Sequence, residues 1–277
     1  MKGNFPDYDF LGSVYIGTNF LELIETLDSI ITQTLAPKNV VIVVDGFISK
    51  EVYKTLNRYK KKLPLKLIFS KKNLGLGLSL RKGLKNCKSK IILRFDTDDI
   101  NFSNRAYLQV KELISSNIDI VGSQVYEFES NPNKFLTTKK VPLNNKQIKK
   151  QIIFRNPMNH PTVGFYKDSI IKLDGGYRDF PLYEDYDLWI RAISHGLKFK
   201  NISIPLVAMR IKNQRARRRG FNIIIKESRL IGSFFKISPF KGFIFLPIFL
   251  IRSLIALLPL SLFSFLYKFF FRERHKF

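Results

Sequence analysis

Short apolar runs alternate with amphipathic stretches along the first third of the chain. The run at 39–45 is β-branched and too apolar for a half-exposed strand, which is typical of a parallel sheet covered on both faces. Between such runs, Leu and Ile recur at the spacing of one helix face. These patterns predict strands at 10–15, 39–45, 65–70 and 90–95, with helices at 20–34, 49–62 and 76–87. The alternation favours an α/β fold with a mostly parallel, Rossmann-like sheet flanked by helices.

The middle of the chain is less regular, although the same two periodicities continue. We expect helices at 103–116, 145–154 and 183–195, strands at 119–128 and 162–166, a polar loop at 129–140, and one or two short strands within 202–211. Gly175-Gly176 predicts a turn. Ligands of parallel sheets bind at the carboxyl ends of the strands, which is where Asp45 and Asp96 stand.

The end of the chain differs in kind, because residues 242–271 are almost wholly apolar. Arg252, Lys268, Pro247 and Pro259 interrupt this stretch, so each uncharged run is shorter than the roughly 18–20 residues of a spanning helix. We therefore expect interfacial helices or a re-entrant hairpin; the alternative is a buried helix pair of a soluble domain. Cations surround the stretch: Arg215, Arg217, Arg218, Arg219, Lys241, Arg272, Arg274 and Lys276.

Composition narrows the class of protein. With 45% hydrophobic and 25% charged residues, the chain has enough apolar surface for a globular core, which excludes intrinsic disorder. A single cysteine, Cys87, excludes a disulfide framework and a thiolate metal cluster. The polar first residues show no signal peptide, so we expect the reducing cytosol. A net charge of +25 predicts a polyanionic partner: nucleic acid, an anionic membrane surface or phosphorylated substrates.

Two acidic clusters carry the candidate chemistry. The first places Asp96, Asp98 and Asp99 directly after a buried strand, where a divalent cation such as Mg²⁺ or Mn²⁺ would relieve their repulsion. The alternative is that Asp98 or Asp99 caps the helix at 103–116. Arg94, just before the cluster, is expected to pair with a phosphate or to orient an aspartate.

The second cluster begins the helix at 183–195 and holds Glu184, Asp185 and Asp187 beside the only Trp. First-turn acids stabilise the helix dipole, but three exceed what that effect requires. A carboxylate here is suited to take a proton from a substrate hydroxyl. His160, in a loop restricted by prolines, is either a structural hydrogen bonder or a ligand. The sequence 73–77, Asn-Leu-Gly-Leu-Gly, predicts a tight strand-to-helix turn rather than a complete phosphate loop.

Taken together and in order, these segments resemble family 2 glycosyltransferases of the GT-A fold. The resemblance covers residues 9–211 and is greatest to the bacterial type that builds O-antigen, capsule or amylovoran-like exopolysaccharide. It rests on the following ordered set: Ser13-Val14-Tyr15, Val44-Asp45-Gly46, Asn73 to Gly77, Arg94 to Asp99, Asn159 to Thr162, Gly175 to Arg178 and Glu184 to Trp189.

The resemblance implies an inverting transferase. Its donor would be a nucleotide-diphospho-sugar, most often a UDP-sugar, and its acceptor a hydroxyl of a polyprenyl-diphosphate-linked glycan. Asp185 would be the general base and Asp98 would hold the metal ion, while Asp96 would contact the ribose or the metal. The donor pocket would be formed by Ser13, Val14, Tyr15, Asp45, Arg94, Asp96 and Thr97, and the acceptor side by Glu184, Trp189 and His160.

Three positions depart from the pattern that the resemblance implies. Phe47 follows Asp45-Gly46 where many members carry Ser, and Leu80 stands where many carry Arg. Residues 209–212 contain no His to complete a metal site, so we expect Arg210 or Lys212 to meet the diphosphate.

The resemblance also sets the expected organisation. Residues 1–215 would form the GT-A domain, with the nucleotide-binding part at about 1–100 and the acceptor part at about 101–215. Residues 216–277 would form a basic and apolar helical tail that associates with the membrane, which would place the protein at the cytoplasmic face of the inner membrane as a peripheral or monotopic enzyme.

Two other functions remain open at this point. A sugar nucleotidyltransferase would need a Gly-rich activating loop with Lys or Arg after the first strand, and Gly17-Thr18-Asn19 does not supply one. A nucleic-acid-binding protein would need a basic face with exposed aromatics, whereas the cations here are dispersed, so we expect no nucleic acid partner. The transferase hypothesis requires the acids at 96–98 and at 185 to converge on one cleft.

Overall fold

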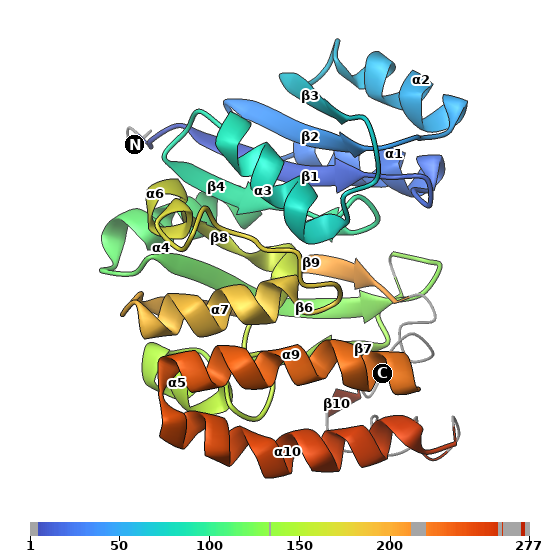
Figure 1. Cartoon of the computed structure of the whole chain (residues 1–277). Coiled ribbons are helices and arrows are strands. Elements are labelled where there is room, and N and C mark those ends of the chain that lie inside the picture. The colour runs from blue at the N-terminus through green and yellow to red at the C-terminus, as the bar shows by residue number, and fades with distance from the viewer. Residues whose placement is uncertain (1–4, 133, 212–219, 260–261, 263–272, 275–277) are drawn as a thin grey trace.

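The computed structural model of the chain describes residues 5–132, 134–211, 220–259, 262 and 273–274. Its amino-terminal half is a parallel sheet, as the sequence predicts, and the structure adds the strand order β3-β2-β1-β4 (Figure 1). The strands are β1 (Tyr8–Val14), β2 (Asn39–Asp45), β3 (Leu65–Ser70) and β4 (Ile91–Arg94). They are connected by helices α1 (Phe20–Ile31), α2 (Lys50–Tyr59) and α3 (Leu76–Asn86).

Alternate side chains of the central strands pack on opposite faces of this sheet. Leu11 and Val41 belong to a core shared with α3, while Phe10, Val40 and Ile42 join a second core formed with α1 and α2. Because both faces are covered, β1 and β2 are apolar almost throughout. The carboxyl edge of β1 and β2 is thereby held between two packed layers.

The second half of the sheet is largely antiparallel. Strand β8 (Gly164–Tyr166) pairs with β4 and β6, and β6 (Ile120–Phe128) also pairs with β7 (Thr137–Lys139) and β9 (Phe199–Arg210). Short strands β5 (Ile100–Asn101) and β10 (Glu273–Arg274) pair with β9 and β7. The helical elements here are α4 (Arg105–Ser115), α5 (Asn145–Gln151), η1 (His160–Thr162), α6 (Lys167–Ile171) and α7 (Glu184–Ser194).

Two expectations for this half are wrong. The segment expected as a polar loop at 129–140 contains β7, and the short strands expected within 202–211 are one strand of 12 residues that begins at Phe199. Its pairing with β6 shifts register beside Pro205, which has no amide to donate to the ladder. That irregularity hides the length of the strand in the sequence pattern.

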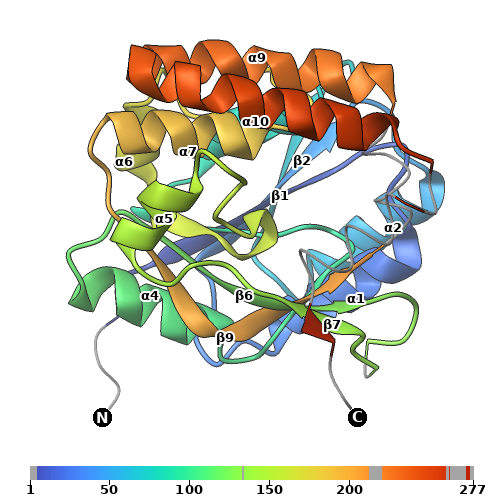
Figure 2. The same cartoon turned by 90° about the horizontal axis from the view of Figure 1, so that it is seen from below.

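The apolar end of the chain forms an antiparallel pair of helices, α9 (Phe221–Ile237) and α10 (Pro239–Leu257), which lie side by side in both views (Figures 1 and 2). Pro247 lies inside α10 and does not interrupt it, contrary to expectation. Among the described residues, α10 alone is long and apolar enough to cross a membrane, by length and composition only. The expected basic cluster 215–219 lies outside the described residues, as do Lys212, Lys268, Arg272 and Lys276.

Candidate functional site

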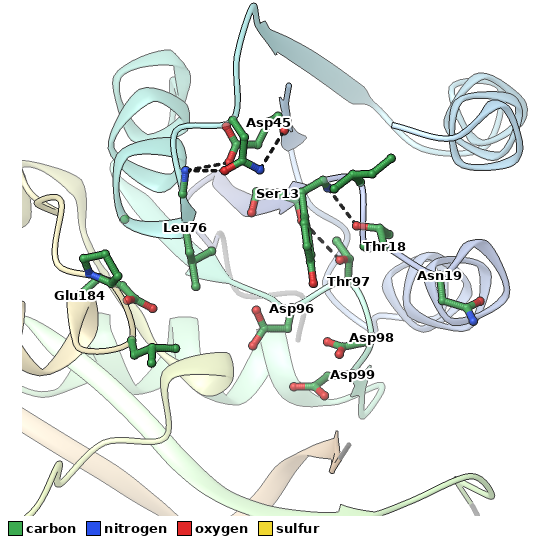
Figure 3. A pocket seen from close by; sticks show the side chains of 18 of the residues that line it. Ser13, Thr18, Asn19, Asp45, Leu76, Asp96, Thr97, Asp98, Asp99 and Glu184 are labelled. Atoms are coloured by element: carbon green, nitrogen blue, oxygen red, sulfur yellow. Dashed lines mark hydrogen bonds between the residues drawn. The ribbon is translucent and has the colours of Figure 1, made fainter. Parts of the chain in front are cut away.

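A cavity of about 800 Å³ opens at the carboxyl edge of β1 and β2 (Figure 3). Its walls come from distant parts of the chain: the ends of β1, β2 and β9, the turn before α3, the segment 96–99 after β4, and the loop that leads into α7. Of the residues predicted from the sequence, those that line it are Ser13, Tyr15, Asp45, Asp96, Thr97, Asp98 and Glu184. Those that do not are Val14, Arg94, His160, Asp185 and Trp189.

Asp45 organises the wall at the end of β2. Its carboxylate accepts hydrogen bonds from the backbone amides of Leu74 (2.7 Å) and Gly75 (3.0 Å). Gly75 has a φ of +81° and begins α3, and a Cβ on Gly46 (φ +76°) would lie 2.7 Å from the Asn73 nitrogen. The segment 73–77 is therefore the tight strand-to-helix turn that the sequence predicts.

The end of β1 is tied to the acidic segment. The Thr97 hydroxyl donates to the Ser13 carbonyl (3.3 Å), and the Tyr15 amide donates to the Thr18 hydroxyl (2.9 Å). Ser13, Tyr15 and Thr97 thus share one wall of the cavity, while the Val14 side chain points into the core beneath it. Thr18, Asn19 and Glu22 also line this wall, and no sequence motif singles them out.

Three carboxylates meet in the segment after β4. Oxygen atoms of Asp96, Asp98 and Asp99 lie within 4.8 Å of one another. Asp99 is buried, and that burial, together with the charges of Asp98 and Asp96, raises its pKa well above the usual range. Its Oδ2 has no hydrogen-bond partner among the described residues. Helix α4 is preceded by Asn104 and not by an aspartate, so the capping alternative is wrong.

The acidic segment is held from behind by arginines. Arg94 is buried and contacts Asp96 through both terminal nitrogens, one of them at 2.6 Å. Of its two expected roles, the structure shows the orientation of an aspartate. Arg105 in turn donates to the Arg94 carbonyl (2.5 Å). These charge-assisted bonds fix the direction in which Asp96 points.

Arg210, at the end of β9, joins four segments at the rim of the cavity. Its Nε donates to the Asp98 carbonyl (3.2 Å), its Nη1 to the Glu129 carbonyl (3.3 Å), and its Nη2 to Glu25. Its amide donates to Asp99 (2.8 Å). Arg210 or Lys212 was expected to meet the diphosphate; the side-chain nitrogens of Arg210 donate to the protein itself, Lys212 lies outside the described residues, and the expectation stays a prediction.

The acids at the start of α7 face different surroundings. Glu184 lines the cavity, is 8% exposed, and has its pKa raised to about 7 by burial and then by the charge of Asp185. Asp185 is half-buried and accepts a hydrogen bond from the Asn156 amide group (2.6 Å). Asp187 is buried and pairs with Arg191 at 2.8 Å. Helix-dipole stabilisation therefore does not account for all three.

His160 and Trp189 lie behind the cavity wall. His160 contacts the Tyr177 hydroxyl (3.0 Å), and burial lowers its pKa well below the usual range, followed by repulsion from Arg94. Trp189 is 0% exposed and meets the Phe199 ring edge-on at 6.1 Å. Both were expected on the acceptor side, and neither lines the cavity: the Trp189 ring is in the core, and His160 is partly buried beside Tyr177 and Trp189.

Comparisons with known proteins agree with this geometry. The sequence profile of the family described as Glycosyl transferase family 2 matches residues 19–173. The chain is 35% identical to the UDP-Gal:alpha-D-GlcNAc-diphosphoundecaprenol beta-1,3-galactosyltransferase of Escherichia coli, over 97% of this chain and 98% of that one. It is 33% identical to the amylovoran biosynthesis glycosyltransferase AmsE of Erwinia amylovora, over 94% and 98%.

Among solved structures, the chain resembles S. aureus TarS 1-349 in complex with UDP-GlcNAc. The TM-score is 0.67 at 16% identity, over 89% of this chain and 72% of that one. This likeness concerns the fold alone, and with the family match it confirms the GT-A fold that the sequence predicts.

Proposed function

The chain belongs to glycosyl transferase family 2, and we propose that it moves a sugar from a UDP-sugar to a hydroxyl of a glycan carried on a polyprenyl diphosphate. The observation that carries the proposal is that Asp96, Asp98 and Asp99 line the same cavity as Glu184 (Figure 3). The relatives from E. coli and Erwinia amylovora, named for a diphosphoundecaprenol-linked acceptor and for amylovoran, support a role in the synthesis of a cell-surface polysaccharide.

The nucleoside of the donor is proposed to lie at the ends of β1 and β2. Tyr15 is 43% exposed there and offers a ring to a base, and Ser13 lines the same wall; Val14, which does not line the cavity, is proposed to support the wall from the core. Asp45 keeps lone pairs beyond the two amides that it already accepts, because a carboxylate has about four acceptor sites. A base N–H group is a suitable donor to them.

Asp96, Asp98 and Asp99 fit a Mg²⁺ or Mn²⁺ ion, since their oxygens are hard ligands and Asp99 keeps one buried oxygen without a described partner. When bound, such an ion would neutralise charge on the departing nucleoside diphosphate. Arg94 orients the Asp96 carboxylate and the Arg210 amide donates to the Asp99 carboxylate, so the protein itself fixes two of the three carboxylates.

Asp185 does not itself line the cavity but adjoins Glu184, which does, and it is proposed as the general base that takes the proton of the acceptor hydroxyl. Asn156 fixes its carboxylate at 2.6 Å, which leaves its position set before substrate arrives. Glu184, one residue earlier, is proposed to hold the acceptor, because at neutral pH a carboxyl group with a pKa of about 7 both donates and accepts hydrogen bonds. One base opposite one leaving group supports direct displacement with inversion.

The proposed acceptor sets the location. A lipid diphosphate lies in a membrane, and a basic chain with an apolar helix is suited to an anionic surface. We therefore propose the cytoplasmic face of the plasma membrane, where nucleotide-sugars are available.

The test is a donor screen with purified protein and a synthetic polyprenyl-diphosphate-linked sugar. We expect transfer that depends on Mg²⁺ or Mn²⁺, that Asp98→Ala abolishes, and that Asp185→Asn lowers in kcat by roughly 10²–10⁴-fold. Glu184→Gln is expected to raise KM for the acceptor more than it lowers kcat.

The anomeric configuration of the product, read by NMR, tests inversion. A full loss of kcat in Glu184→Gln with an active Asp185→Asn would reassign the base to Glu184. Transfer that survives Asp98→Ala and a metal chelator would overturn the proposed metal site.

A further inference from the structure

A stripe of apolar side chains runs along the outer side of α10. Its members fall on one side of the helix at about 100° per residue and are 55–72% exposed: Phe240, Phe243, Leu250, Ile251, Leu254 and Leu257. We call these residues the α10 face. The opposite side of the helix is packed, because Gly242, Phe245 and Ala256 are buried. An apolar stripe of this size needs a partner of its own.

Helices α9 and α10 together form a helical hairpin, and the charges of this hairpin indicate what the partner is. Residues 221–257 contain one acid, Glu227, which is buried and pairs with Arg252 at 2.6 Å. The other charged residues of the hairpin are all cations: Lys226, Arg229, Lys236 and Lys241. A surface that is apolar and basic, with no exposed carboxylate, complements an anionic lipid surface. The same charges would repel a second copy of the hairpin.

We propose that the α10 face docks on an anionic lipid bilayer, with α10 lying in the plane of the membrane and not across it. The choice of lipid rests on the proposed function, whose acceptor is carried in a membrane. Helix α10 has 19 residues and is long enough to span a membrane. Its orientation therefore depends on its contacts with the rest of the protein.

Contacts along the whole hairpin hold α10 parallel to α9. At one end the Gly220 amide donates to the Ala256 carbonyl (3.1 Å), in the middle Arg252 pairs with Glu227 (2.6 Å), and toward the turn the rings of Phe234 and Phe245 lie 4.3 Å apart. At the other end a Cβ on Gly242 would lie 2.5 Å from the Phe235 ring, so the two helices are in close contact. A spanning α10 would have to break these contacts or draw the cations of α9 into hydrocarbon.

Helix α9 is in turn fixed to the catalytic domain. The Ser233 hydroxyl donates to Asp187 on α7 (2.8 Å), and Arg229 donates to the Asp179 carbonyl (2.8 Å). The Tyr183 hydroxyl donates to Glu227 (2.9 Å). Because Asp179 lines the cavity and Tyr183 precedes Glu184, a docked hairpin would hold the acceptor wall of the cavity in a fixed position above the lipid.

Vesicle flotation tests the docking without donor or acceptor, so its failure is distinct from failure of the transferase proposal. The full chain is mixed with vesicles that contain phosphatidylglycerol, or with vesicles of phosphatidylcholine alone. We expect binding to the anionic vesicles, and a loss of roughly 100-fold or more in the triple variant Phe243→Ser, Leu250→Ser, Leu254→Ser. The matched control, Tyr53→Ser with Ile114→Ser, replaces side chains that are each 47% exposed on α2 and α4, and it should bind as the unaltered chain does.

Removal of the lysines separates charge from apolar contact. Lys226→Gln, Lys236→Gln and Lys241→Gln are expected to lower the affinity for anionic vesicles roughly fivefold each, while leaving binding to phosphatidylcholine unchanged. Circular dichroism checks that each variant is folded. Flotation of the triple serine variant like the unaltered chain, or a soluble dimer that this variant dissociates and that binds no vesicles, would overturn the proposal.

Depth measurements test the in-plane orientation. A fluorophore is attached to Phe240→Cys or to Leu254→Cys in a Cys87→Ser background, and brominated lipids report its depth. The proposal expects both labels at the same shallow depth, since they sit towards opposite ends of a helix that lies along the surface. One shallow label and one at the bilayer centre or in the far leaflet would show a spanning helix and overturn it.

Discussion

Glu184 illustrates at the scale of one residue how burial prepares a carboxyl group for a sugar substrate. It is enclosed by the loop before α7 and by the start of α3, where a Cβ on Gly77 would lie 3.1 Å from the Glu184 Cβ. Burial and the neighbouring Asp185 raise its pKa to about 7. The same group is ionised in the unfolded chain above a pH of about 4.3.

Because the pKa of Glu184 is higher in the folded state than in the unfolded state, the free energy of unfolding falls as the pH rises between the two values. Below the unfolded pKa the carboxyl group is neutral in both states, so folding carries no cost from its ionisation; as the pH rises to about 7 the unfolded state ionises first and stability is lost. Glu184→Gln does not titrate, so we expect it to gain roughly 1–3 kcal/mol over the unaltered chain between about pH 5 and about pH 8. Urea unfolding at the two pH values, followed by the fluorescence of the only Trp, measures the gain. A constant difference would show that Glu184 titrates normally.

The sequence predicts the positions of Asp96 and Asp98 but not the hydrogen bonds that orient their side chains. Asp96 and Asp98 follow an apolar strand of a parallel sheet, and strand ends of such a sheet converge on one edge. The Arg94–Asp96 pair depends on side-chain rotamers and on Arg105, which belongs to a later helix. Neither the rotamers nor the contact with Arg105 can be read from the spacing of residues along the chain. For the same reason Trp189, two residues beyond Asp187, looked available to a substrate and is buried.

At the scale of elements, strand boundaries are predicted best where an apolar run is bounded by Gly or Pro. β2 and β3 have the boundaries expected from their apolar runs, since Gly46 and Pro64 bracket them. A helical tail is expected over 216–277, but the bounds of α9 are not predicted, because its run of Ile223 to Ile225 and its Gly232 lower local helix propensity. Its stability comes from packing on α7 and α10.

The link between the helices and the cavity wall is open to a double-mutant cycle. Glu227 is buried between Tyr183 and Arg252. Glu227→Gln is expected to lower the free energy of unfolding by about 1–3 kcal/mol and to raise KM for the acceptor, because the wall loses its anchor. Arg252→Met should act in the same direction, and the double variant should cost less than the sum of the two. Strict additivity of the two changes, measured by urea unfolding, would show that the pair is not coupled.

At the scale of the whole molecule, one edge of the parallel sheet forms the cavity and the opposite edge contributes to stability. The carboxyl edge carries the cavity, and the amino edge carries Asp9, which is buried on β1. Its carboxylate accepts hydrogen bonds from Asn39 (2.7 Å) and from the Lys88 and Ser89 amides (2.7 and 3.1 Å). Burial alone raises its pKa, but these bonds outweigh burial and lower it.

Asp9→Asn separates stability from catalysis. The amide cannot accept all the hydrogen bonds that the carboxylate accepts, so we expect a loss of about 1–3 kcal/mol in the free energy of unfolding. The effect should shrink as the pH falls below the carboxyl range, because a lowered pKa stabilises the fold only while the group is ionised. KM and kcat should stay unchanged, since Asp9 is at the far edge from the cavity. A changed KM would contradict this division between the edges.

The strand β10 has a practical consequence for handling the protein. Glu273 and Arg274 pair with β7, which lies beside the last residues of β6, Val125 to Glu127, and so near the same edge as the cavity. The amino terminus instead enters the fold at the opposite edge, where β1 begins (Figure 1). An affinity tag or a fused fluorescent protein at the carboxyl terminus would therefore crowd the approach of a lipid-borne substrate. The same addition at the amino terminus leaves that approach clear.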